Sequence, residues 1–171
     1  RHAETEALVN MVMSPDVRFA VLVGESGCGK TSLLRAALLP RLWEAGQLPI
    51  YCRAFIDPLA AIGAEAQRQS QIAQLPNEPL GDYLRRLSQI LQTTLIIICD
   101  QFEEFFVNFP ADAEREPFLS FVAETSADPL ARIAFLLAVR GDFFHLVSAV
   151  FSERVTDPLA SRQVFHLRNF T

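Results

Sequence analysis

The chain has 171 residues, of which half are hydrophobic and 14 are Phe, and its formal net charge is −5. This length suits one domain with a substantial core, and the composition excludes a disordered chain. No apolar stretch reaches the roughly 18 residues that would span a membrane, and no signal-peptide pattern is present. The acidic balance and the lack of a basic run do not favour nucleic-acid binding. The three cysteines show no metal-site spacing, and this usage favours a reduced, cytoplasmic setting.

Hydrophobic periodicity predicts strands and helices in alternation. Short apolar runs predict strands at 19–23, 49–56, 94–99, 132–139 and 164–167. Helical spacing predicts helices at 3–13, from the glycine-rich loop to Pro40, and at 57–73, 83–91, 102–109, 118–125 and 142–148. This alternation is typical of an α/β three-layer sandwich, with a mainly parallel five-stranded sheet and helices on both faces.

The segment after the first predicted strand fits G-x-x-x-x-G-K-[ST], the phosphate-binding P-loop, without a mismatch. Its glycines let successive backbone N–H groups turn toward a phosphate, and the following helix N-terminus adds a favourable dipole. Strand, glycine loop and helix are the context that this motif requires. The expected nucleotide-binding residues are Gly24, Glu25, Ser26, Gly27, Cys28, Gly29, Lys30, Thr31 and Ser32.

A second motif supplies a metal-binding acid. The run 95–99 is strongly apolar and ends at Asp100, which is the Walker B arrangement. Lys30 would reach the β- and γ-phosphates, Thr31 would offer its hydroxyl to Mg²⁺, and Asp100 would hold the ion through its bound water. Because ligands of open parallel sheets lie at the carboxyl ends of strands, we expect Asp100 to face the P-loop.

The residues after this strand resemble a known family. Residues 100–106 look like the D-Q-F-E-E-L-F signature of STAND-class NTPases, an AAA+-like branch of P-loop proteins. Residues 1–4 resemble the end of that family's G-R-x-x-E motif, and 139–143 resemble its R-x-D-F segment. The resemblance implies that residues 1–171 are one P-loop NTPase domain, a fragment of a longer protein, with an N-terminal helix within 1–15.

The resemblance also implies a function. Family members bind ATP or ADP with Mg²⁺ and use slow ATP hydrolysis as a conformational switch. Helical, winged-helix and repeat domains that follow the core would be its partners, together with an ATP-dependent homo-oligomer.

The catalytic candidates are Glu103, Lys30 and Arg140. Many hydrolytic P-loop proteins carry Glu directly after the Walker B Asp, but this chain has Gln101 there. Glu103 is favoured over Glu104 to orient water because STAND relatives carry an acid three residues after the Asp. Both acids also suit a helix N-terminus without any catalytic role. Arg140 could sense the γ-phosphate or pair with a nearby acid.

Alternative functions stay open at this stage. Gln101 keeps a non-hydrolysing, ATP-operated scaffold under consideration. An AAA+ ATPase acting on DNA shares the N-terminal motif, although the acidic balance and the segment 100–104 speak against it. A small-molecule kinase would need an acceptor site that the sequence does not show, and a GTPase would need an N-K-x-D segment that it lacks. Adenine is indicated by the family resemblance alone.

Overall fold

A computed structural model describes residues 2–53, 56–155 and 163–168. Five strands form one sheet in the order β2-β3-β4-β1-β5, and every neighbouring pair is parallel. The strands are β1 (Phe19–Gly24), β2 (Leu48–Cys52), β3 (Leu95–Cys99), β4 (Ile133–Arg140) and β5 (Val164–Leu167). The predicted α/β architecture with a parallel five-stranded sheet is therefore confirmed.

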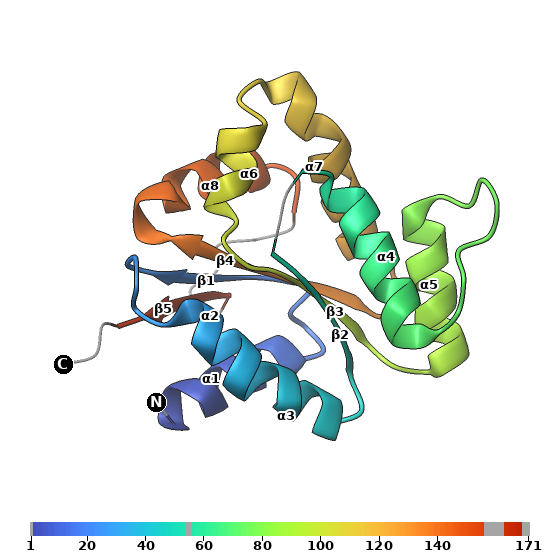
Figure 1. Cartoon of the computed structure of the whole chain (residues 1–171), viewed down its shortest axis with the longest axis horizontal. Helices are drawn as coiled ribbons and strands as arrows, with labels where there is room; N and C mark the ends of the chain where they lie inside the picture. Colours follow the sequence, from blue (N-terminus) through green and yellow to red (C-terminus); the bar gives the residue numbers. More distant parts are fainter. Residues whose placement is uncertain (1, 54–55, 156–162, 169–171) are drawn as a thin grey trace.

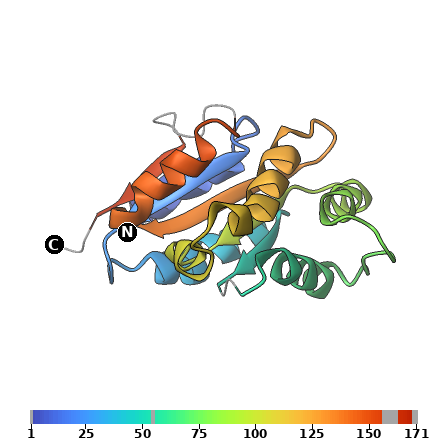
Figure 2. The ribbon, with the colours of Figure 1, turned by 90° about the horizontal axis from the view of Figure 1, so that it is seen from above.

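Helices cover both faces of the sheet (Figure 1). One face carries α1 (His2–Met13) and a continuous helical stretch made of α2 (Lys30–Ser32), the π-helical η1 (Leu33–Leu38) and α3 (Leu39–Glu44). The other face carries α4 (Pro58–Ser70), α5 (Leu80–Leu91), α6 (Glu103–Asn108), α7 (Asp112–Ala127) and α8 (Phe144–Phe151), the last preceded by the short 3₁₀ helix η2 (Gly141–Phe143). Figure 2 shows this second layer from above, with α8, α7 and the α4–α5 pair spread across the sheet.

Alternation along the strands divides the core into two halves. In β1, Val21 and Val23 pack toward the α4–α8 layer, whereas Ala20 and Leu22 pack toward α1 and η1. Successive side chains of a strand point to opposite faces, so a strand that is covered on both sides must be apolar at every position. All residues of β1 and β3 are indeed buried, which explains why these runs are the clearest strands in the sequence.

The phenylalanines after β3 pack in the core, as their helical spacing predicts. Phe102, Phe105 and Phe106 are buried, and the rings of Phe102 and Phe105 stack with centroids 4.9 Å apart. This cluster anchors α6 against the sheet directly beside Asp100.

Several predicted boundaries were wrong. Among the helices, α7 begins at Asp112 where the pattern predicts 118, and α5 begins at Leu80 where the pattern predicts 83. The helix after the P-loop continues past Pro40 to Glu44, because a π-helical turn precedes the proline and shifts the local hydrogen-bond pattern. The second strand ends at Cys52, although the pattern predicts an extended segment over 49–56; residues 54–55 lie outside the described part of the chain. Asp57 then caps α4, accepting a hydrogen bond from the Ala60 backbone N–H at 3.0 Å.

Candidate functional site

The carboxyl ends of three strands carry the predicted motifs. The P-loop follows β1, Asp100 follows β3, and Arg140 ends β4, which lies between them in the sheet. Gly24 and Arg140 are register partners in the β1–β4 pair. The fold therefore gathers these residues at one edge, where open parallel sheets bind ligands.

The glycines of the P-loop are required by its shape. Gly27 and Gly29 have φ of 75° and 90°, values that side-chain-bearing residues rarely adopt. At Gly24 the constraint is space, because a Cβ there would lie 2.6 Å from the Cys28 Sγ and 3.2 Å from the Leu167 carbonyl oxygen. The loop can close tightly only with glycine at these positions.

Lys30 points back into the loop that precedes it. Its Nζ donates to the carbonyl oxygens of Gly24 at 2.7 Å and Glu25 at 2.9 Å, and the residue is only 8% exposed. A buried ammonium needs such partners, since desolvating an unpaired charge is costly. The positive charge is thus held inside the turn of backbone where the motif binds phosphate.

Asp100 connects the two motifs. The carboxylate is fully buried, and its Oδ2 accepts a hydrogen bond from the Thr31 hydroxyl at 2.7 Å. The same oxygen accepts a second hydrogen bond from the Tyr51 hydroxyl, also at 2.7 Å. The predicted metal-site pair, Thr31 and Asp100, is therefore in direct contact.

These groups fit a Mg²⁺ ion bound together with a nucleotide. Mg²⁺ takes few protein ligands and completes its octahedron with water and phosphate oxygens, so one hydroxyl and one carboxylate suffice. Within the described residues, no group of three or more His, Cys, Asp or Glu side chains could hold a metal by itself. Any magnesium site here would accordingly depend on the phosphates.

Backbone hydrogen bonds explain the left-handed conformation of Gln101. The Asp100 N–H donates to the Cys52 carbonyl of β2 at 2.9 Å, whereas the Phe102 N–H donates to the Ala138 carbonyl of β4 at 2.9 Å. Gln101 lies between them with φ of 56° and turns the chain from one neighbouring strand to the other. Its side chain lies beside Arg53 and Glu104.

Two of the three catalytic candidates, Glu103 and Arg140, meet at the end of β4. A carboxylate oxygen of Glu103 accepts a hydrogen bond from the backbone N–H of Arg140 at 3.1 Å. The Arg140 guanidinium donates to both carboxylate oxygens of Asp142, at 2.6 and 2.7 Å, and lies over the Phe143 ring. This pairing lowers the pKa of Asp142 below its usual value and raises that of Arg140. Of the two alternatives that the sequence leaves open for Arg140, the structure shows the pairing with a nearby acid.

The remaining predicted residues line the loop itself. The Glu25 carboxylate lies beside Gly141, 3.4 Å from where a Cβ would stand, so the P-loop reaches the end of β4. Cys28 is buried against Gly24, whereas Ser26 and Ser32 are exposed.

Sequence reasoning missed Tyr51 and Asp142. Tyr51 belongs to no motif, and its only signal is a hydroxyl-bearing side chain in an otherwise apolar strand that neighbours β3. Asp142 lies within the arginine segment, and its spacing of two residues from Arg140 is the signal that could have suggested the pair.

Fold and site together define a P-loop NTPase. The profile of the novel STAND NTPase 1 family matches residues 1–171, the whole chain. The chain therefore belongs to the novel STAND NTPase 1 family. No curated protein sequence gives a significant match.

Solved structures with a similar fold include ORC proteins and a Walker-type ATPase. The ORC2 protein of Aeropyrum pernix, solved with ADPNP and ADP, is 25% identical with a TM-score of 0.66, over 98% of this chain and 47% of that protein. A Walker-type ATPase of Pyrococcus abyssi is 16% identical with a TM-score of 0.67, and the match covers 99% of this chain and 53% of that protein. Drosophila ORC bound to DNA is 17% identical with a TM-score of 0.58, over 100% of this chain and 47% of its own.

The chain thus spans about half the length of these structures. Among the described residues, no helix is both long and apolar enough to cross a bilayer.

Proposed function

We propose that this chain is the nucleotide-binding core of a STAND-like signalling ATPase. It binds Mg-ATP and Mg-ADP and hydrolyses ATP slowly, and the exchange between the two nucleotides acts as a conformational switch in the cytoplasm. The observation that carries the proposal is the contact between Thr31 and Asp100, 2.7 Å apart, beside a lysine held inside the P-loop. Lys30 and the loop amides would bind phosphates, and Mg²⁺ would neutralise charge on the transferred phosphoryl group.

The proposed catalytic step requires rearrangement at the end of β4. Glu103 would orient the attacking water, and its carboxylate is already held at this edge by the Arg140 backbone. Arg140 would contact the γ-phosphate after leaving Asp142. The proposed partners of the switch are helical, winged-helix and repeat domains and an ATP-dependent homo-oligomer, because the family resemblance indicates them.

Calorimetric titration with ATP, ADP and GTP in the presence of Mg²⁺ tests the binding function. We expect adenine nucleotides to bind, and Lys30→Ala to abolish binding because the ammonium contacts the phosphates. Glu44→Ala is the control, since Glu44 is an exposed residue at the far end of the same helical stretch and belongs to no predicted site. Wild-type protein that is folded and binds no nucleotide would refute the proposal.

Two observations favour second candidates. Gln101 stands where a hydrolytic Glu would stand, and Glu103 accepts a backbone hydrogen bond, which favours an ATP-operated scaffold without turnover. Multiple-turnover phosphate release separates that scaffold from a slow ATPase.

Drosophila ORC was solved bound to DNA, but at 17% identity this likeness concerns the fold, and the net charge of −5 opposes DNA binding. Turnover that rises with added duplex DNA would favour the DNA-directed function.

A further inference from the structure

Tyr51 contacts the metal-site carboxylate from a strand that carries no nucleotide-binding motif. Its hydroxyl donates to Asp100 Oδ2 at 2.7 Å, and the next residue, Cys52, accepts a hydrogen bond from the Asp100 N–H. The end of β2 therefore holds Asp100 through both its side chain and its backbone.

Counting acceptor positions shows what this contact does. A carboxylate offers about four lone pairs, two on each oxygen. Oδ2 accepts from Thr31 and Tyr51, while Oδ1 accepts from the Gln101 N–H at 2.9 Å. Among the described residues, these three donors leave one lone pair, on Oδ1, so the two hydroxyls select which oxygen can receive a water molecule.

A tyrosine hydroxyl ordinarily carries its proton at neutral pH, because its usual pKa is about 10. Burial raises the pKa of Tyr51 above its usual value, and the hydrogen bond to Asp100 raises it further. Arg35 and Arg53 act in the opposite direction but do not reverse the shift. The 2.7 Å distance between the Tyr51 hydroxyl and Asp100 Oδ2 is the observation that makes Tyr51 a donor to this carboxylate.

We propose that Tyr51 is a positioning residue of the magnesium site: its hydroxyl occupies Asp100 Oδ2, so that Oδ1 receives a water of the nucleotide-bound Mg²⁺. The proposal rests on the proposed nucleotide-binding function. Without this hydroxyl, the buried carboxylate has a free acceptor on Oδ2 and no longer presents one defined oxygen to the hydrated ion.

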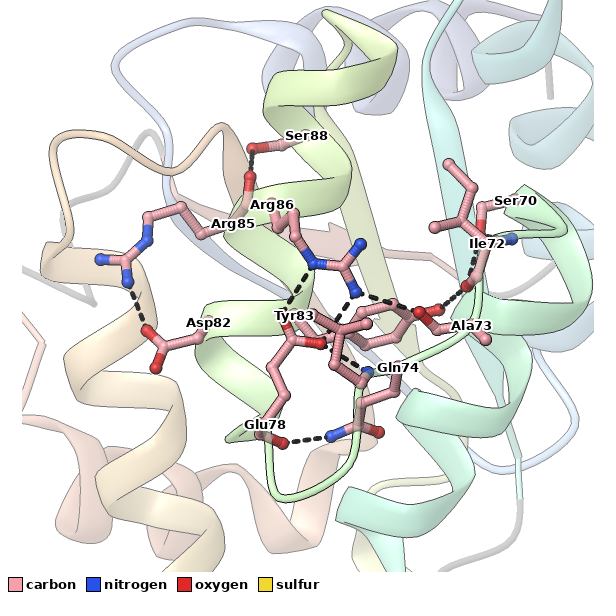
Figure 3. Close-up of polar contacts among 11 residues, drawn as sticks. Ser70, Ile72, Ala73, Gln74, Glu78, Asp82, Tyr83, Arg85, Arg86 and Ser88 are labelled. Atoms are coloured by element: carbon pink, nitrogen blue, oxygen red, sulfur yellow. Dashed lines mark hydrogen bonds and ion pairs between the residues drawn. The ribbon is translucent and has the colours of Figure 1, made fainter.

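The test compares ADP affinity with and without Mg²⁺ in wild type and in Tyr51→Phe, which removes only the hydroxyl. We expect the gain in affinity that Mg²⁺ confers to fall about tenfold in the variant, since a hydrogen bond to a charged group is lost. Affinity for ADP in the absence of Mg²⁺ should be unchanged. Tyr83→Phe is the matched control, because the chain has two tyrosines and the Tyr83 hydroxyl donates to the Ile72 carbonyl in the segment between α4 and α5 (Figure 3).

Each outcome decides the matter. An unchanged Mg²⁺ effect in Tyr51→Phe overturns the proposal, as does an equal loss of affinity with and without Mg²⁺. If wild type binds no Mg-ADP, the proposed function itself fails. Should Tyr51→Phe not fold, the wild-type protein with ¹³C-labelled tyrosine gives the answer: Mg²⁺ added to the ADP complex should shift the Tyr51 resonance but not that of Tyr83, and a silent Tyr51 refutes the role.

Discussion

At the scale of single residues, Asp100 is where the two motifs of the site meet. Its backbone N–H is tied to β2, its Oδ2 binds the first turn of the P-loop helix, and its Oδ1 binds the next peptide. Three donors restrict the orientation of this buried carboxylate, which is the preorganisation that the proposed magnesium site would need. The candidate acids that follow it are held less tightly and are distinguishable by mutation.

Glu103→Gln should lower ATP turnover by about 10²–10⁴-fold, the range for losing a group that activates water. Nucleotide affinity should be retained, because the amide oxygen of the substituted side chain can still accept the hydrogen bond from the Arg140 N–H. The measurement is single-turnover phosphate release, with Glu104→Gln as the neighbouring control. Equal turnover of Glu103→Gln and wild type would remove Glu103 from the mechanism.

Arg140→Ala should reduce the preference for ATP over ADP by about tenfold, as expected for losing a charge-assisted contact to the γ-phosphate. Asp142→Asn should have the opposite effect, since it weakens the pair that now holds the guanidinium. Competition titrations with both nucleotides measure this preference. If both variants keep the wild-type preference, Arg140 is a structural pair and not a sensor.

At the scale of elements, the segment between α4 and α5 is held by one partly buried ion pair (Figure 3). The Arg86 guanidinium donates to both Glu78 carboxylate oxygens, at 2.7 and 2.8 Å, and to the Ala73 carbonyl. Glu78 also accepts from the Leu75 N–H, and its side chain is 11% exposed. This arrangement fixes a long connection that contains two prolines and no regular structure.

The Glu78–Arg86 pair should make stability pH-dependent. The hydrogen bond from Arg86 lowers the pKa of the Glu78 carboxyl from 4.5 to about 2. Because the pKa of Glu78 is lower in the folded state than in the unfolded state, the pair stabilises the fold at pH values above the unfolded-state pKa of 4.5. This stabilisation is lost as the pH falls toward about 2. Urea unfolding should therefore show that Glu78→Gln lowers the free energy of unfolding more near pH 7 than near pH 3. Near pH 3, about half of the pair's contribution to stability is already lost. Glu65→Gln, which breaks a pair with the more exposed Arg68, should show a smaller deficit; equal deficits at both pH values would contradict the assignment.

Sequence reasoning located four of the five strands well: the partly buried β5, whose bounds match the prediction, and three strands that are buried on both faces. The patterns predict β1, β3 and β4 within a residue at each end, because apolar runs between polar turns leave little choice. The continuation of the helix past Pro40 was not predicted, because a π-helical turn depends on hydrogen-bond geometry that no residue type indicates. For the site, the motifs located Lys30, Thr31 and Asp100, whereas the Tyr51 contact depends on strand order, which brings β2 beside β3.

At the scale of the whole molecule, nucleotide binding and folding are linked. The P-loop follows β1 and Asp100 follows β3, two strands far apart in the chain, so a ligand that contacts both binds only the folded state. Mg-ADP at about 100 times its dissociation constant should raise the free energy of unfolding by about 2.7 kcal/mol. Thermal unfolding with and without Mg-ADP measures this, and Lys30→Ala at the same ADP concentration should show no shift. A wild-type midpoint that is insensitive to Mg-ADP would contradict the linkage.

The two carbonyl partners of Lys30 bear on how nucleotides leave. When a phosphate departs, the ammonium can return at once to the oxygens of Gly24 and Glu25, so no bare charge remains in the loop. In the proposed switch, these two carbonyl oxygens would be the partners of the ammonium whenever no phosphate contacts it. Exchange of ADP for ATP in the proposed switch would then change the hydrogen-bond partners of one side chain, Lys30.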